Sequence, residues 1–222
     1  MKYIIGNWKA NKNMAEVNQW LEEFMKLDLS IFKDKVTLII CPPFPFLPVV
    51  QWRVKDFPFI KMGAQDISAF ESGTYTGEVA ANSLVGLVDY VIVGHSERRK
   101  HNKETDEMIL NKFHMARKYN IEPIFCIRNQ NDLFPKEVAF LAYEPPESIS
   151  TGDGKGNTAS LEAVLKMKQA LSLDSSIKFI YGASVNPENA AEFLKNDEID
   201  GVLPGGASLD PQQFFQIAKS AL

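Results

Sequence analysis

A lysine, a histidine and a glutamate stand in short polar segments that directly follow apolar runs, at Lys9, His95 and Glu144. Ammonium, imidazole and carboxylate groups are those that proteins use to exchange protons and to stabilise negative charge during a reaction. Two turns of small residues, 182–184 and 205–208, also follow apolar runs, and their glycines let the backbone approach a ligand closely. These segments predict one site that combines acid–base groups with a backbone cradle.

Each of these residues has an ordinary explanation when it is taken alone. Lys9 could be a solvated surface lysine, and His95 could be a hydrogen-bonded structural histidine. Glu144 could be an ordinary loop carboxylate before two prolines. The glycine pair at 205–206 could serve only a tight turn. Their occurrence at successive ends of predicted strands favours a shared site instead.

Short runs of apolar, often β-branched residues recur along the chain without two-residue alternation, which is typical of strands buried on both faces. Amphipathic stretches separate most of them, and this alternation predicts a parallel α/β fold. Eight such runs in 222 residues favour a closed (β/α)8 barrel, with 1–222 as a single domain whose site lies where the strands end. The predicted strands are 3–5, 36–41, 59–64, 90–93, 124–127, 138–143, 178–181 and 201–203. The predicted helices are 14–27, 103–119, 158–171, 188–195 and 212–220, the last two opened by Pro187 and Pro211.

The connection at 128–136 is too short for an ordinary crossover, which needs about a dozen residues or more. A helix rises only ~1.5 Å per residue and would not reach the next strand. We therefore expect an extended connection with at most one helical turn, so that one outer helix is largely missing. Leu133 and Phe134 are expected to fill the resulting gap between the helices at 103–119 and 157–171.

Taken in order, the motifs at the strand ends resemble those of the triosephosphate isomerase family. The segment Gly-His-Ser-Glu-Arg-Arg at 94–99 is highly specific, whereas the Gly-Gly-Ala-Ser turn is shared with other phosphate-binding barrels. The resemblance covers the whole chain except the contracted link, and it implies a TIM barrel that interconverts D-glyceraldehyde 3-phosphate and dihydroxyacetone phosphate by proton transfer through an enediolate. The matching motifs lie at 7–9, 63–65, 76–78, 94–99, 142–145, 181–185 and 205–208.

The resemblance also implies roles for the reacting groups, since this family is known for pairing a glutamate base with a neutral histidine. Glu144 would be the base, and His95 would donate a hydrogen bond to the carbonyl and enediolate oxygens. Lys9 would place a cation near the developing charge and the phosphate, and Asn7 would add a side-chain donor. No metal or organic cofactor is implied.

Glu97 resembles the family's second carboxylate and would orient Lys9, although a salt bridge from Glu97 to Lys112 is the alternative. Backbone N–H groups in the two small-residue turns would hold the phosphate, aided by the N-terminus of a following helix. The implied substrate-binding residues are Asn7, Lys9, Ser150, Ser184, Gly205 and Gly206.

Two loops bear on how the site is completed. The family's lid usually begins Pro-x-Trp, but 145–152 reads Pro-Pro-Glu-Ser-Ile-Ser-Thr-Gly, so Glu147 stands where tryptophan is usual. The loop at 70–77 resembles the one through which the family's subunits interdigitate. A homodimer is therefore implied, with Thr76 approaching Asn7 and His95 across the interface.

The composition narrows the possible partners. The net charge of −4 without a block of Lys or Arg argues against nucleic acid or a membrane surface. The apolar run at the N-terminus is too short for a signal peptide, and no run has the length of a spanning helix. Cys41 and Cys126 are expected to be reduced thiols. Together these features predict a cytoplasmic protein. The remaining alternatives are another phosphate-binding barrel isomerase or aldolase, and a barrel kept only for binding.

Overall fold

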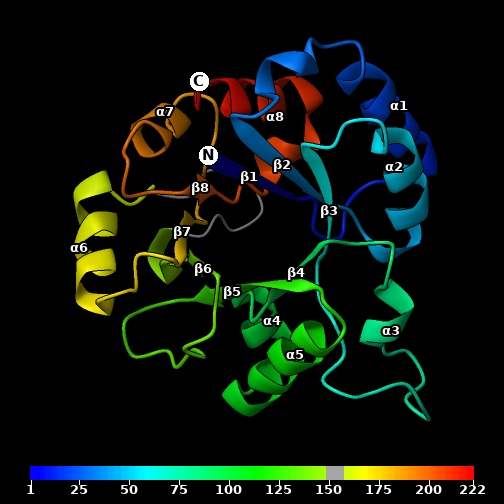
Figure 1. Ribbon diagram of the computed structural model, residues 1–222, viewed down its shortest axis with the longest axis vertical. Coiled ribbons are helices and arrows are strands. Elements are labelled where there is room, and N and C mark those ends of the chain that lie inside the picture. Colours follow the sequence, from blue (N-terminus) through cyan, green and yellow to red (C-terminus); the bar gives the residue numbers. More distant parts are fainter. Residues whose placement is uncertain (149–157) are drawn as a thin grey trace.

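The computed structural model describes residues 1–148 and 158–222. In these residues eight parallel strands pair in sequence order, and the eighth pairs with the first, so that the sheet closes into a barrel. Helices surround this ring, with α1, α2 and α8 along one side and α4 and α5 along the opposite side (Figure 1). The strands are β1 (Lys2–Asn7), β2 (Val36–Cys41), β3 (Ile60–Ala64), β4 (Tyr90–Val93), β5 (Glu122–Ile127), β6 (Phe140–Tyr143), β7 (Lys178–Tyr181) and β8 (Gly201–Val202).

Several helices begin at residues whose side chains cap them. Asn13 forms a capping box with Glu16 at the start of α1, and Asp210 caps α8, which opens with Pro211 as predicted. The helix predicted at 188–195 begins later, after a turn in which the Asn186 side chain accepts from two backbone N–H groups. The helices are α1 (Met14–Phe24), α2 (Leu47–Val54), α3 (Ala81–Leu84), α4 (Ser96–His101), α5 (Asp106–Lys118), α6 (Leu161–Leu171), α7 (Ala190–Leu194) and α8 (Pro211–Lys219). Within the described ranges, no helix has both the length and the apolarity that a membrane span requires.

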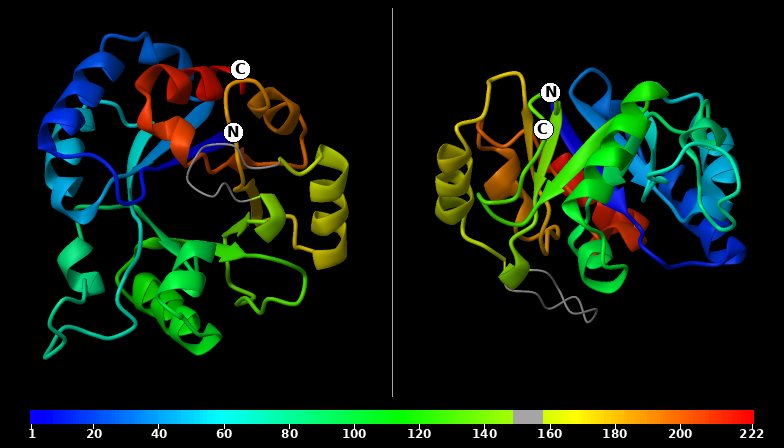
Figure 2. Two further views of the ribbon diagram at one scale, coloured as in Figure 1. Left: turned by 180° about the vertical axis from the view of Figure 1, so that it is seen from behind. Right: turned by 90° about the horizontal axis from the view of Figure 1, so that it is seen from below.

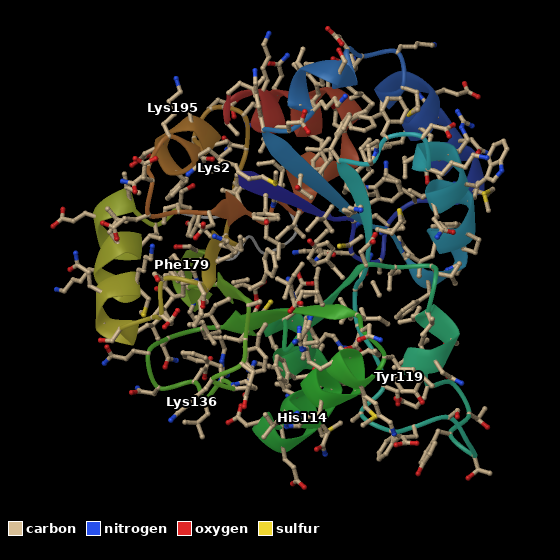
Figure 3. The ribbon with its side chains drawn as sticks, viewed as in Figure 1. Lys2, His114, Tyr119, Lys136, Phe179 and Lys195 are labelled. Atoms are coloured by element: carbon tan, nitrogen blue, oxygen red, sulfur yellow. The ribbon has the colours of Figure 1, made fainter. Side chains whose placement is uncertain are left out.

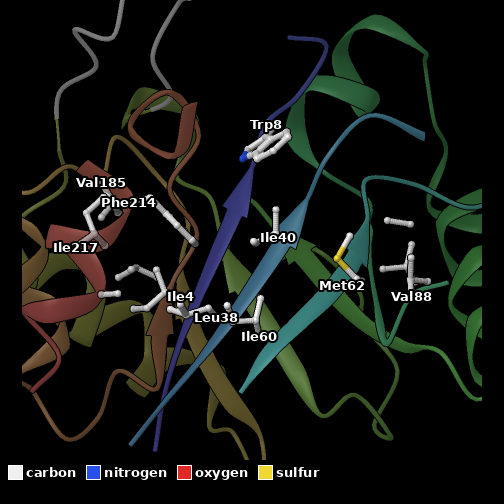
Figure 4. Packing of buried hydrophobic residues seen from close by; sticks show 14 of the residues in the cluster. Ile4, Trp8, Leu38, Ile40, Ile60, Met62, Val88, Val185, Phe214 and Ile217 are labelled. Atoms are coloured by element: carbon white, nitrogen blue, oxygen red, sulfur yellow. The ribbon is translucent and has the colours of Figure 1, made fainter. Parts of the chain in front are cut away.

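The strands separate two apolar cores, which explains why their sequences do not alternate. Ile5, Ile39 and Ile124 belong to a cluster inside the barrel, whereas their neighbours Ile4 and Leu38 pack outward against the helices. Figure 4 shows this outer layer, in which Phe214 and Ile217 lie beside Ile4. Burial of both faces stabilises each strand in its place in the barrel. The view from behind shows the same closed ring (Figure 2).

The connection between β5 and β6 is extended and contains no helical turn in 128–136, as the length of the segment predicts. The Arg128 guanidinium forks onto the Asp132 carboxylate with N···O distances of 3.0 and 2.7 Å, and the Arg128 N–H donates to the same carboxylate. Lys136 lies on the outer edge of this connection (Figure 3). The expectation for Leu133 is wrong, because its side chain is 78% exposed, whereas Phe134 is half-buried against the outer core.

Candidate active site

A cavity of about 240 Å³ opens where β1, β3 and β4 end. Parallel strands in a barrel place the residues that follow them at one face, so segments far apart in sequence meet there. Four of the predicted site residues line this cavity together: Asn7, Lys9, His95 and Glu97. Larger hollows between α1 and α8 and between α2 and the segment 86–89 contain none of the predicted site residues.

His95 is placed by a tight turn between β4 and α4. Gly94 has φ +74°, and an added Cβ would lie 2.9 Å from Ile109, so the turn requires glycine. His95 is the N-cap of α4, and its Nδ1 accepts a hydrogen bond from the Glu97 N–H at 3.2 Å. Because Nδ1 is an acceptor, the ring proton of a neutral His95 must lie on Nε2, the atom that faces Glu144.

Glu144 follows β6 and is 1% exposed. Its Oε2 accepts a hydrogen bond from the Ser96 N–H at 2.9 Å. Its Oε1 lies 3.1 Å from Nε2 of His95 but forms no hydrogen bond of good geometry within the described residues. A buried carboxylate oxygen left in this state is costly for stability, and such groups are typical of reacting sites.

Lys9 is held by the residues around it. Its backbone N–H donates to Oδ1 of Asn7 at 3.0 Å, and its ammonium lies 2.6 Å from Oε1 of Glu97. Burial raises the pKa of Glu97, but the hydrogen bond and charge of Lys9 outweigh burial and hold that pKa below its ordinary value. Glu97 therefore pairs with Lys9, as the resemblance implies. The alternative partner, Lys112, instead bonds to Asp66 and Glu104, at distances down to 2.6 Å.

The turn after β8 lies directly against Lys9. An added Cβ at Gly205 would meet Cε of Lys9 at 3.1 Å, whereas Gly206 has open space at that position. A short helical turn at 206–209 begins here, and the Trp20 indole N–H donates to the Ser208 carbonyl at 3.2 Å. A ligand could therefore approach this backbone without a side chain in the way.

Ser184 lies in the turn after β7, with φ +47°, and its hydroxyl donates to the Ser148 carbonyl at 2.7 Å. The contacts of this turn run to the start of the segment after β6 and not to Lys9. Gly182 in the same turn approaches Glu144, since an added Cβ would lie 3.1 Å from its Cγ. Ser150 lies outside the described residues.

The cavity also contains residues to which the sequence analysis gave no role. Gln65, Arg98, His101 and Asn102 line it beside the predicted residues. Gln65 directly follows β3, so the rule that found the other residues at strand ends could have found it as well. Arg98 reaches the site from the first turns of α4, where neither its type nor its spacing distinguishes it from a surface arginine.

A closed parallel barrel whose acid–base groups and glycine turn gather at the carboxyl ends of the strands is a β/α-barrel enzyme of the phosphate-binding kind. A sequence model of the triosephosphate isomerase family matches residues 2–221. The chain therefore belongs to the triosephosphate isomerase family.

Proteins that carry this name are similar to the chain over nearly its full length. The triosephosphate isomerase of Dictyoglomus thermophilum is 37% identical over 249 residues, with 99% of both chains covered. That of Dictyoglomus turgidum is 37% identical over 250 residues, with the same coverage. That of Alkalilimnicola ehrlichii is 35% identical over 251 residues, which span 98% of this chain and 97% of the relative. These lengths exceed 222, so the relatives contain residues that this chain lacks.

Proposed function

We propose that the chain interconverts D-glyceraldehyde 3-phosphate and dihydroxyacetone phosphate, with Glu144 as the base that moves the proton between the two carbons. The observation that carries the proposal is the state of this carboxylate: it is buried, one oxygen is fixed by the Ser96 N–H, and the other lies 3.1 Å from His95 with no hydrogen bond among the described residues. A carboxylate with one oxygen fixed and the other available is suited to accept a proton. The reaction requires no cofactor and would serve glycolysis and gluconeogenesis.

His95 supplies the electrophile. With Nδ1 accepting from the Glu97 N–H, a neutral His95 presents the Nε2 proton to the substrate, where it donates a hydrogen bond to the carbonyl oxygen and then to the enediolate oxygen. His95 is buried and is the N-cap of α4, so its ring is held in this orientation.

Lys9 supplies the positive charge, Glu97 orients its ammonium, and Asn7 supports its backbone. The phosphate is held by backbone N–H groups at Gly205 and Gly206, beside Lys9. Ser184 adds a further contact to the phosphate, and Ser150 is the other substrate-binding residue that the family resemblance implies. This division places the reacting carbons beside His95 and Glu144, whose side chains lie against each other.

The test compares Glu144→Gln with the control Glu137→Gln in a coupled assay. Gln has nearly the shape of Glu but does not accept a proton at neutral pH, and the lost interaction belongs to the transition state. We expect kcat to fall by roughly 10³-fold or more in Glu144→Gln, while a substrate analogue with the same phosphate binds with nearly unchanged affinity. Glu137 is exposed between β5 and β6, so its variant should keep the parent kcat. Unchanged turnover in Glu144→Gln would refute this assignment of the base.

We further propose a cytoplasmic homodimer formed through the loop at 70–77. Phe70 and Tyr75 stack in this loop with ring centroids 4.5 Å apart, and each is 45% exposed. A pair of stacked aromatic rings left in water is a feature that a subunit interface would cover. Light scattering at assay concentration should give twice the mass of one chain, and an active monomer would contradict the proposal.

A further inference from the structure

The backbone of Lys9 adopts a conformation that residues with a side chain seldom occupy, with φ +53°. Such a conformation persists only where the surroundings impose it. Asn7 holds the N–H of this residue, and Glu97 holds its ammonium. The carbonyl is held by a third residue, Gln65, whose Nε2 donates to it at 2.9 Å.

Gln65 makes a second bond that fixes its own position. The same Nε2 donates to the carbonyl of Cys41, the last residue of β2, also at 2.9 Å. Gln65 itself follows β3, so one amide group ties together the ends of three neighbouring strands. Both amide hydrogens are used for this purpose, and the side chain lines the cavity that contains Lys9 and His95.

We propose that Gln65 is a positioning residue for the isomerisation: its amide holds the Lys9 carbonyl and so keeps the lysine backbone in the conformation that directs the ammonium into the site. This inference rests on the proposed function and adds to it a residue that acts only through Lys9. Glutamine suits the role because it donates two hydrogen bonds and carries no charge. A glutamate would lose both donors and would bring a second negative charge close to the Lys9–Glu97 pair.

The experiment measures kcat and KM for Gln65→Ala and for Gln65→Glu, which keeps the size of the side chain. Gln51→Ala is the matched control, because the Gln51 side chain also donates to a backbone carbonyl, that of Gly86, but lies away from the site. We expect kcat/KM to fall roughly 10- to 100-fold in both Gln65 variants, since a displaced catalytic group costs up to about that much. Gln51→Ala should keep the parent kcat/KM, and all variants should keep the parent's mass in light scattering.

The decisive arm repeats Gln65→Ala in a Lys9→Ala background. If Gln65 acts through Lys9, its loss changes kcat/KM less than about twofold once the lysine is absent. An equal fold-loss with and without Lys9 would overturn the proposal, because it would indicate a structural role. Gln65 variants with parent kcat/KM would overturn this inference alone, whereas an inactive parent chain would reject the proposed function together with it.

Discussion

The mouth at the ends of β1, β3 and β4 and the connection between β5 and β6 are both irregular segments, but they are held in different ways. In the mouth, the Lys9 N–H, carbonyl and ammonium each have a partner, and the carbonyl's partner, Gln65, bonds to a second strand as well. In the connection, the contacts that fix the turn are local, from Arg128 to Asp132 and to Asn129 from the two residues before Leu133, and the Leu133 side chain is exposed.

This difference indicates what each region does. The mouth holds Lys9 in an unfavourable backbone conformation, and Glu144, which follows β6 and lies against His95, has one buried carboxylate oxygen without a hydrogen bond among the described residues. This arrangement serves chemistry at a cost in stability. The connection contains no predicted site residue, and its contacts only stabilise a short link. Substitutions in the mouth should therefore change catalysis more than stability, and those in the connection should do the reverse.

The largest effect among these substitutions is expected from Lys9→Ala. It removes the only positive charge that the proposed mechanism places beside the reacting oxygen, and loss of one such group lowers the rate by about 10²–10³-fold. Steady-state kinetics should show kcat/KM reduced by that factor. The control is Lys33→Met, because Lys33 is exposed before β2 at the opposite end of the barrel. If kcat/KM of the Lys9→Ala enzyme is within threefold of the parent value, the contrast between the mouth and the connection is wrong.

A smaller effect, on stability alone, is expected from Asp132→Asn. Burial raises the pKa of Asp132, but the hydrogen bonds and charge of Arg128 outweigh burial and hold that pKa below its ordinary value. A carboxylate of this kind stabilises the fold above the pKa of the unfolded chain, about 3.9, and this contribution is lost as the pH falls through the folded pKa.

The free energy of unfolding at pH 7 should therefore be about 1–3 kcal/mol lower in Asp132→Asn, with kcat unchanged. The gap between variant and parent should narrow as the pH falls below about 4. Denaturant unfolding from pH 7 to pH 3 measures this gap. A gap that is constant or widens on acidification would show that the Arg128–Asp132 contact does not stabilise the connection.

The smallest effects are expected from two neighbouring apolar residues, whose truncation should lower the stability by different amounts. Phe134 is half-buried against the outer core, so truncation to Ala should cost about 1–2 kcal/mol and lower the melting temperature by several degrees. Leu133 is 78% exposed, and Leu133→Ala should stay within about 0.5 kcal/mol of the parent. Thermal unfolding of the two variants side by side checks this order, and equal losses would place both residues in the core.

The sequence predicts the strands well because burial on both faces leaves a signal that no other element shares. The bounds 36–41, 90–93 and 178–181 agree with β2, β4 and β7. The helix at Leu47–Val54 was missed, because Pro45 and Pro48 near its start resemble breakers, whereas proline is well accommodated in a first helical turn.

Within the site, residues at strand ends are predictable, but partners distant in sequence are not. The choice between Lys9 and Lys112 as the partner of Glu97 depended on the buried contacts that Lys112 makes with Asp66 and Glu104. These contacts join α5 to the segment after β3 and to the link between α4 and α5, and they leave no periodic signal. Leu133 was mispredicted because residue type does not determine which way a side chain points in an irregular segment.

The most direct test of the account is the fate of the transferred hydrogen. Dihydroxyacetone phosphate is converted by the parent enzyme in D₂O, and the product is examined by NMR. If Glu144 takes the proton and exchanges it with solvent before returning one to the neighbouring carbon, D-glyceraldehyde 3-phosphate will carry deuterium at carbon 2. Product formed at full rate with the substrate's own hydrogen fully retained at this carbon would contradict a base that exchanges its proton with solvent during the reaction.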